Sequence, residues 1–94
     1  GQIRVISSPD GKAWRSEALL AEPGIDLRDP HLSITARGQL MLVMGGSVYR
    51  QAVYGGRQPR VAFSSDGRKW TPPRRVLREG DWLWRVTWQG GYAW

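Results

Sequence analysis

Two short segments of this chain place a hydroxyl, a carboxylate and an indole side chain at the same spacing. Ser8-Pro9-Asp10-Gly11-Lys12-Ala13-Trp14 and Ser64-Ser65-Asp66-Gly67-Arg68-Lys69-Trp70 both read S-x-D-G-x-x-W. An Asp carboxylate can accept hydrogen bonds from nearby backbone N–H groups, a Ser hydroxyl can cap the same turn, and Gly tolerates a positive φ. The Trp leaves the turn on the next strand, where it can pack between sheets. Because each position has a structural role and none requires catalysis, we expect Asp10 and Asp66 to hold turns.

The two segments lie 56 residues apart. A repeat of roughly 40–55 residues, with short strands and turn signals between the copies, is typical of the blades of a β-propeller. A propeller is a closed ring of four-stranded antiparallel blades. Because two copies correspond to about two blades, we expect this chain to be an incomplete ring by itself.

The repeated segment resembles the Asp-box, or BNR repeat, of the sialidase (neuraminidase) superfamily, whose usual pattern is S-x-D-x-G-x-T-W. Both copies have one residue fewer between Asp and Trp and lack the Thr, and a strand beginning Arg-Val, at Arg4 and Arg60, precedes each copy. The resemblance covers nearly the whole chain and implies a sialidase-like propeller of six blades, with the Asp-box away from the active site. The structural residues of the two boxes are Ser8, Asp10, Gly11, Trp14, Ser64, Asp66, Gly67 and Trp70.

The strands that position these segments follow from the alternation of apolar and polar residues and from the turn signals between them. Strands are predicted at 2–7, 14–20, 31–36, 39–44, 59–63, 70–77 and 81–88, and a last strand starts at 92–94. A long loop is predicted at 45–58. Pro72-Pro73 places the strand at 70–77 at an outer edge, because proline cannot donate a ladder hydrogen bond.

If the strands of a blade are named A to D from the axis to the rim, the single partial domain at 1–94 reads C-D, A-B-C-D, A-B. It holds an outer half-blade at 1–20, a full blade at 26–78 and an inner half-blade at 81–94. A second match supports this order, because three residues near one crossover recur at an offset of 52. The matched pairs are Asp29 with Asp81, Thr35 with Thr87, and Gly38 with Gly90.

The composition fits an all-β fold and excludes several classes of site. The chain has 94 residues with six Trp and 12 Gly, and no apolar segment approaches the length of a membrane-spanning helix. It has no Cys, which excludes a disulfide framework and a cysteine-based metal site, and its single His predicts no metal site within one chain. We expect no cofactor and no membrane partner.

A net charge of +6 favours an anionic partner, such as a carboxylated sugar, a nucleic acid or an acidic surface. The alternative is a solvated basic face. The arginines are spread along the chain, and their densest group, within 68–78, falls at a predicted turn and outer strand. This distribution argues against nucleic-acid binding.

In sialidase-like propellers, ligands bind at the axis, where loops enter the innermost strands. The resemblance implies a ligand site at the two crossovers, with candidate residues Arg28, Asp29, His31, Asp81, Trp82, Trp84 and Arg85. An arginine fork can bind a sugar carboxylate through two hydrogen bonds, and a Trp can stack on a sugar ring. The long loop at 45–58 could cover the same mouth or lie on the rim.

Structural alternatives stay open for these candidates. Arg28 and Asp29 could form an ion pair that Asp81 and Arg85 repeat. His31 could be a strand-edge residue, and the tryptophans could pack between blades.

Hydrolysis of a sialic acid would need three arginines for the carboxylate, a Tyr nucleophile activated by a Glu, and an Asp acid/base, as the resemblance implies. The chain shows no complete copy of this set, because Glu17, Glu22 and Glu79 have no evident Tyr partner. Catalytic residues are therefore left unassigned, and a relation to glycoside hydrolases stays open.

Strand edges and apolar faces at both ends of such a piece favour association. The A-B half could pair with the C-D half of another copy, and this head-to-tail contact closes into a ring if the rotation allows it. Six blades at about two per chain predict a homotrimer; the alternative is a piece of a longer propeller. The leading function is a sialidase-like unit that binds an anionic carbohydrate. The alternative function is a structural or protein-interaction ring without a catalytic site.

Overall fold

The computed structural model describes residues 1–50 and 53–94, and the regular structure within them is β-strand. The strands are β1 (Ile3–Ser7), β2 (Arg15–Leu20), β3 (Ile25–Ile34), β4 (Leu40–Arg50), β5 (Val53–Ser64), β6 (Arg74–Arg75), β7 (Trp88–Gln89) and β8 (Tyr92–Ala93). The predicted all-β class is confirmed for this part of the chain. A search of the same residues finds no helix long and apolar enough to cross a membrane.

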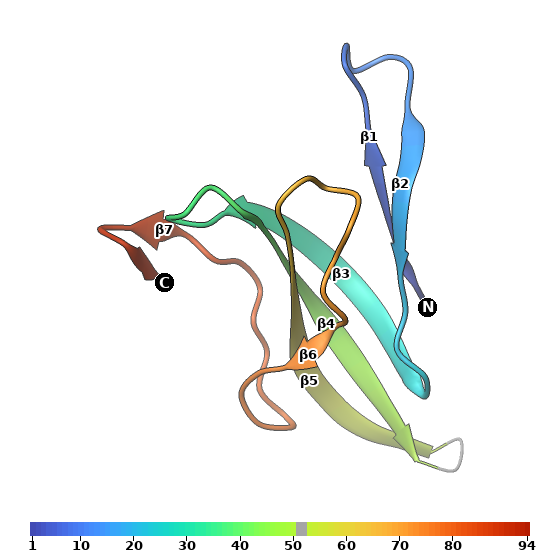
Figure 1. The fold of residues 1–94 in the computed structure, drawn as a ribbon. Coiled ribbons are helices and arrows are strands. Elements are labelled where there is room, and N and C mark those ends of the chain that lie inside the picture. Colours follow the sequence, from blue (N-terminus) through green and yellow to red (C-terminus); the bar gives the residue numbers. More distant parts are fainter. Residues whose placement is uncertain (51–52) are drawn as a thin grey trace.

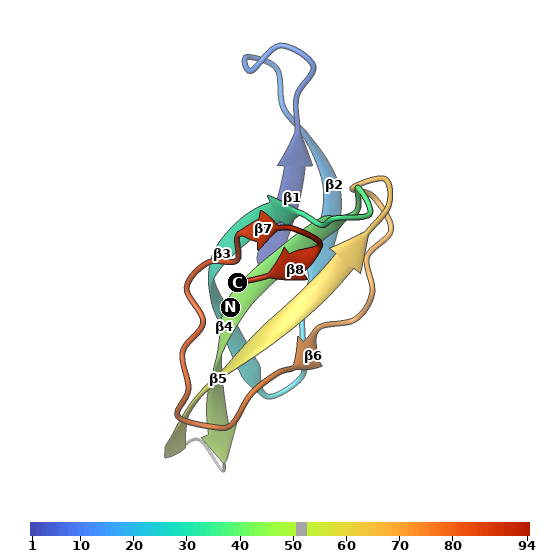
Figure 2. The same ribbon diagram turned by 90° about the vertical axis from the view of Figure 1, so that its left-hand side faces the viewer.

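The strands form three antiparallel sheets that follow the order of the sequence (Figure 1). β1 and β2 form a hairpin, β3-β4-β5-β6 form a four-stranded sheet, and β7 pairs with β8. The β1–β2 hairpin and the 83–88 segment that leads into β7 pack on opposite faces of the four-stranded sheet (Figures 1 and 2). The sequence predicted this order of two, four and two strands.

The 56-residue repeat is reproduced in the register of the strands. In the β1–β2 hairpin, Arg4 lies opposite Leu19 and Val5 lies opposite Ala18. In the β5–β6 hairpin, the residues opposite each other are Arg60 with Arg75 and Val61 with Arg74. Each residue of the second hairpin lies 56 positions after its counterpart in the first, so the two hairpins are copies of one structural unit.

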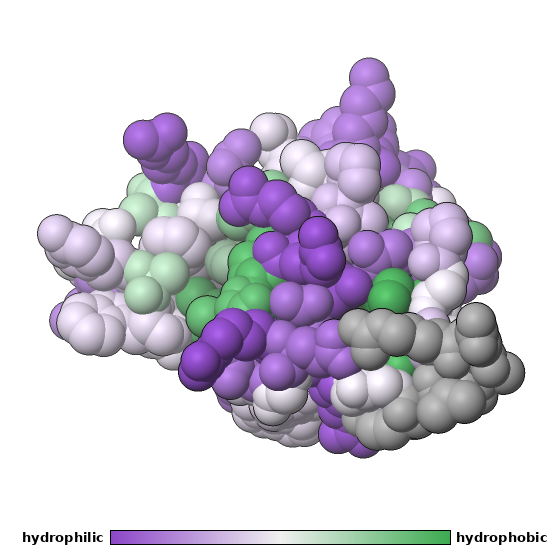
Figure 3. All heavy atoms as spheres, turned by 90° about the horizontal axis from the view of Figure 1, so that it is seen from below, coloured by the Kyte–Doolittle hydropathy of each residue, from purple (hydrophilic) through white to green (hydrophobic). Residues whose placement is uncertain are grey.

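Alternate residues of β4 and β5 build two apolar layers, one on each face of the four-stranded sheet. The layer toward the β1–β2 hairpin contains Ile3, Leu20, Leu27, Leu42, Met44 and Ala62. The layer on the other face contains Met41, Val43 and Val61, with Leu83, Val86 and Trp88 packed against it. Seen from below, apolar side chains reach the surface between strongly polar ones (Figure 3). Because both faces of the sheet are covered, the residues at 41–44 are all apolar instead of alternating.

The predicted long loop at 45–58 is wrong for the residues that the structure describes. β4 continues to Arg50 and β5 begins at Val53, so the two strands form a long hairpin, and residues 51–52 lie outside the described part. The glycines at 45 and 46 are required by close packing and not by a loop. A Cβ on Gly46 would lie 3.0 Å from both Ile25 Cγ2 and Gln58 O, and a Cβ on Gly45 would overlap the indole of Trp82. Close approach, and not a turn, requires these glycines.

Three predicted strands have different bounds. β3 begins at Ile25, six residues before the strand predicted at 31–36, and contains a bulge between Arg28 and His31, with Asp29 at φ 51°. Residues 81–87 form no strand and instead pack side chains on the sheet. The strand expected at 70–77 is reduced to β6, because the prolines before it cannot donate ladder hydrogen bonds.

The 52-residue match is not reproduced in the register. The Thr35 N–H donates to Gln39 O across a three-residue turn, whereas Thr87 exchanges backbone hydrogen bonds with Trp94. The second turn is formed by the two glycines at 90–91, which have φ of 59° and 81°, as a tight two-residue hairpin requires. Thr35 directly precedes its turn, whereas Trp88 and Gln89 lie between Thr87 and the second turn, so the offset of 52 pairs residues that do not occupy equivalent places.

Candidate functional site

The carboxylate of Asp10 is engaged by the backbone of its own turn. The Gly11 N–H donates to Ser8 Oγ at 2.8 Å, and the N–H groups of Lys12 and Ala13 donate to Asp10 Oδ1 at 2.8 and 3.0 Å. These backbone hydrogen bonds, with that of Ala13 first, hold the pKa of Asp10 below its ordinary value. The side chain stabilises a turn and is not presented to a substrate.

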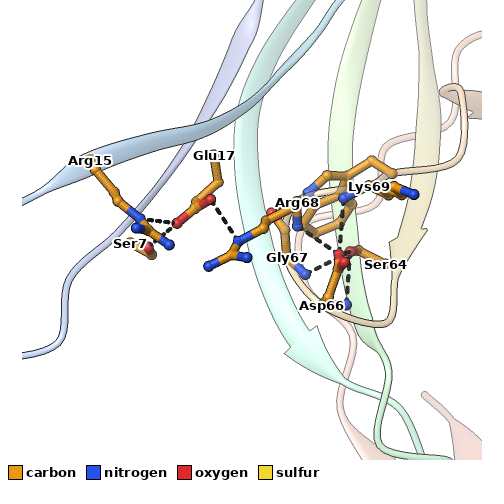
Figure 4. Close-up of polar contacts among 9 residues, drawn as sticks. Ser7, Arg15, Glu17, Ser64, Asp66, Gly67, Arg68 and Lys69 are labelled. Atoms are coloured by element: carbon orange, nitrogen blue, oxygen red, sulfur yellow. Dashed lines mark hydrogen bonds and ion pairs between the residues drawn. The ribbon is translucent and has the colours of Figure 1, made fainter.

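The second turn repeats this arrangement (Figure 4). The Gly67 N–H donates to Ser64 Oγ at 2.7 Å, and the N–H groups of Arg68 and Lys69 donate to Asp66 Oδ1 at 2.8 and 2.9 Å. The Lys69 and Arg68 hydrogen bonds lower the pKa of Asp66. Both copies of the segment therefore form the same capped turn.

The Trp that ends each segment has different surroundings in the two copies. Trp70 Nε1 donates to Gly67 O at 2.8 Å, and its ring packs against the apolar layer that faces the β1–β2 hairpin. Trp14 holds the equivalent position but is 57% exposed. A hollow lies beside each ring, and its lining residues in the two copies are 56 positions apart. The first hollow is lined by Ser7, Ser8, Pro9, Ala13, Trp14 and Arg15. The corresponding residues at the second are Phe63, Ser64, Ser65, Lys69, Trp70 and Thr71. Only Trp70 has a neighbouring sheet to pack on.

Glu17 of β2 joins the first hairpin to the second turn (Figure 4). Its carboxylate accepts hydrogen bonds from Ser7 Oγ at 2.6 Å and from Arg15 Nε at 2.7 Å, and it pairs with Arg68 Nε at 3.2 Å. The Ser7 hydrogen bond, followed by that of Arg15, lowers the pKa of Glu17. This carboxylate therefore has a structural role.

Glu22 has a comparable role closer to the interior. Arg60 of β5 is 2% exposed, and its Nε donates to Glu22 Oε2 at 2.7 Å while its Nη1 donates to Gln58 O at 3.0 Å. Gly46 leaves space for the arginine stem, since a Cβ there would lie 3.2 Å from Arg60 Cδ. Two of the three glutamates considered for catalysis, Glu17 and Glu22, are thus held in ion pairs with arginines.

Three of the seven candidate ligand residues form a continuous row with Arg57. The ring centroids of His31 and Trp84 are 4.8 Å apart, and those of Trp84 and Trp82 are 6.2 Å apart. The Arg57 guanidinium lies 5.1 Å from the centroid of the Trp82 ring. We call His31, Trp84, Trp82 and Arg57 the aromatic row. It crosses the four-stranded sheet from β3 to β5, and its tryptophans are partly exposed, Trp84 at 54% and Trp82 at 37%.

Two local features place Trp82 on the sheet. Gly45 has no side chain, so the indole contacts the backbone of β4. Asp81 Oδ2 accepts a hydrogen bond from the Arg78 N–H at 3.0 Å, which closes the turn just before Trp82. The ion pair of Asp81 is also with Arg78, at 3.8 Å, so the pair considered with Arg85 is wrong. Arg85 is exposed, and none of the described residues forms a hydrogen bond or ion pair with it.

Arg28 lies directly opposite Gly45 and therefore on the face that the aromatic row covers. Its Nε donates to Asp26 Oδ2 at 2.6 Å, and this bond raises the pKa of Arg28. The side chain is 57% exposed, which leaves part of the guanidinium open to solvent. The ion pair considered with Asp29 is wrong, because Asp29 lies in the bulge, whereas Asp26 lies two residues before Arg28 on the same side of the strand.

His31 lies on β3, an edge strand of the four-stranded sheet, so its expected place at a strand edge is confirmed. Its ring contacts Trp84, and its Nδ1 is buried with no hydrogen-bond partner in the described part of the chain. A search of the same residues finds no group of three or more His, Cys, Asp and Glu side chains that could hold a metal ion.

Three residues of this surface were not predicted as site residues from the sequence: Asp26 and Gly45 were missed, and Arg57 was placed in a loop. The spacing of Asp26 and Arg28 by two residues was the signal for a shared strand face.

The aromatic row combines two chemical properties on one surface. Its exposed indoles offer flat apolar area to the C–H face of a sugar, and the guanidinium groups of Arg28 and Arg57 offer N–H donors to an anion. We compared the chain with models of protein families, with curated proteins and with solved structures, and none of the three comparisons found a match. A functional assignment therefore depends on these residues and their geometry.

Proposed function

We propose that this chain is a sialidase-like β-propeller unit that binds an acidic carbohydrate on the aromatic row. The observation that carries the proposal is the row itself, in which two exposed indoles are neighbours and Arg57 lies over the Trp82 ring, while Arg28 lies on the same face of the sheet. A pyranose ring can stack on Trp84 while its carboxylate accepts hydrogen bonds from an arginine fork. The net charge of +6 favours the approach of such an anion.

The propeller assignment is supported by the repeat of strand register. The β1–β2 hairpin has the register of β5–β6, the last two strands of the four-stranded sheet, and the chain continues into a further hairpin beyond that sheet. One full blade flanked by an outer and an inner half-blade accounts for this order. Three chains of about two blades each would then form a ring of six.

Binding, and not hydrolysis, is the activity proposed. Glu17 and Glu22 are committed to ion pairs with arginines. Asp10 and Asp66 are committed to their turns.

The test is a titration of the 94-residue chain with N-acetylneuraminic acid and with a hexuronic acid oligosaccharide, followed by the indole N–H signals in NMR spectra. We expect the signals of Trp82 and Trp84 to shift with the acidic sugars and not with neutral galactose. Trp84→Ala and Arg28→Ala should abolish the shifts. Asp26→Asn should weaken binding, because Arg28 loses the carboxylate that orients it. Arg37→Ala, at an exposed arginine in the turn between β3 and β4, is the matched control.

An absence of shifts in a folded sample would contradict the proposal, as would equal binding of galactose. Those results would favour a second candidate, a structural or protein-interaction ring without a small-molecule site. The observation behind this alternative is the exposure of large side chains at both ends of the chain, with Trp14 at 57%, Tyr92 at 71% and Trp94 at 75%.

A further inference from the structure

The β1–β2 hairpin has an open face that looks away from the rest of the molecule. Val5 packs toward the four-stranded sheet, and Arg4 and Ile6 alternate with it and point the other way, beside Leu19. Ile6 is 50% exposed, Leu19 is 48% exposed, and Trp14 at the end of the turn is 57% exposed. This face is defined by Arg4, Ile6, Trp14 and Leu19.

The same face is covered where it recurs 56 residues later. Arg60 and Ala62, the counterparts of Arg4 and Ile6, are 2% and 0% exposed, and Trp70 packs in the same apolar layer. The cover is the β1–β2 hairpin itself, which contributes Leu20 to the layer, and the adjacent Glu22, which pairs with Arg60. The chain therefore contains one example of what this face packs against.

We propose that the β1–β2 hairpin of a second copy stacks on the β5–β6 hairpin, in the way that β5–β6 stacks on β1–β2 within one chain. The occupant of the open face is then another copy of this chain. Such a contact joins two different surfaces, so it is head-to-tail and closes into a ring if the rotation allows. The inference rests on the ring assembly proposed above and is independent of the aromatic row, so the sugar titration and the association test can fail separately.

The β5–β6 hairpin has a surface that can receive the second copy. A hollow of about 390 Å³ on it is lined by Val61, Phe63, Thr71, Pro72, Pro73 and Arg74. Within one chain, Trp70 lines a hollow together with Ala18 and Leu20 of β2. The residues 56 positions after these two are Arg74 and Val76. Trp14 of the second copy should therefore lie beside Arg74 and Val76, where an arginine can stack on the indole.

The repeat also predicts which two residues lie opposite each other between copies. Within the chain, Glu17 pairs with Arg68 at 3.2 Å. The residue 56 positions after Glu17 is Pro73, and the residue 56 positions before Arg68 is Lys12. Lys12 of the second copy should thus lie opposite Pro73, and Pro73→Glu should rebuild between copies the ion pair that exists within one.

The first experiment measures self-association by sedimentation at low salt. Pro73→Glu should tighten association of the chain about two- to fivefold, as expected for an exposed ion pair, and Pro73→Lys should weaken it. In chains that also carry Lys12→Glu, Pro73→Lys should tighten association and Pro73→Glu should weaken it. Circular dichroism checks that each variant is folded. Failure of the Lys12→Glu background to reverse the order in folded variants would overturn the proposed contact.

The second experiment uses the lack of cysteine in the chain. Pro73→Cys chains are mixed with Lys12→Cys chains and treated with a short bismaleimide. Cross-linked heterodimers are expected, whereas a mixture with Pro23→Cys, in the connection between β2 and β3 at the end of β2 away from Lys12, should give few. Equal cross-linking in the two mixtures, or a chain that stays monomeric at all concentrations, would contradict the proposal.

Discussion

Trp82 packs on the backbone of Gly45, the residue that lies directly opposite Arg28 on the neighbouring strand. This contact ties the irregular segment at 81–87 to the four-stranded sheet, and it brings an indole and a guanidinium to the same face. The candidate site therefore depends on a glycine that contributes no side chain to it.

Gly45→Ala should displace Trp82, because the added Cβ would overlap the indole. We expect a loss of about 1–3 kcal/mol in the free energy of unfolding, as for other overpacked sites, together with weaker binding of acidic sugar. Urea unfolding followed by circular dichroism measures the first effect. In a Trp82→Ala background the same substitution should cost much less, since the two residues are in contact. An unchanged cost in that background would show that Trp82 does not lie on Gly45.

Glu22→Gln should destabilise the chain, because it leaves the buried guanidinium of Arg60 without its anion. The expected loss is about 3 kcal/mol, the lower end for a broken buried pair, since the Glu22 side chain is 26% exposed. Arg4→Met is the matched control at the equivalent exposed position and should change stability by less than about 0.5 kcal/mol. Urea unfolding of both variants tests this, and equal losses would refute the difference in burial.

Acid should destabilise the fold through carboxylates whose pKa is lowered in the folded chain. Asp10, Asp66 and Glu17 have folded pKa values below their ordinary values. Their stabilising contribution is therefore present above the unfolded pKa, near 4, and is lost as the pH falls through the lower folded pKa. Thermal unfolding should show a Tm that falls between about pH 5 and pH 2. Asp66→Asn should lower the Tm at pH 6 but converge with the unsubstituted chain at low pH, and an equal gap at both pH values would contradict this account of Asp66.

The two equivalent tryptophans should respond differently to truncation. Trp70→Ala should cost about 3 kcal/mol of folding free energy, the lower end for large core side chains, because its partly buried ring packs against the apolar layer. Trp14→Ala should change the stability of the single chain by less than about 0.5 kcal/mol, because Trp14 is 57% exposed. It should instead weaken association of copies. Urea unfolding at low concentration and sedimentation at high concentration separate the two effects, and a large stability loss for Trp14→Ala would refute the assignment.

The hairpins and their capped turns could be predicted because the interactions that form them are local. The Asp and Ser side chains bond backbone groups two or three residues away, and the strands at 2–7 and 14–20 were placed within one or two residues of β1 and β2. The 56-residue repeat was also visible in the sequence, since the second hairpin has the same turn residues as the first.

The candidate site was predicted less completely because it depends on contacts between distant segments. Gly45 is glycine because of an indole at position 82, and the sequence alone shows the glycine but not its neighbour. Arg60 is buried because Glu22, 38 residues away, supplies its counter-charge. The tryptophans at 82 and 84 were placed on a strand, whereas their rings are positioned by the sheet beneath them. Local alternation carries no information on such packing.

The native mass of the 94-residue chain in solution tests the proposed ring most directly. Light scattering on a sizing column should give a single species of three 10.6 kDa chains, because about two blades per chain complete a six-bladed ring. A species that keeps the mass of one chain at every concentration would contradict the ring and the stacking of hairpins between copies.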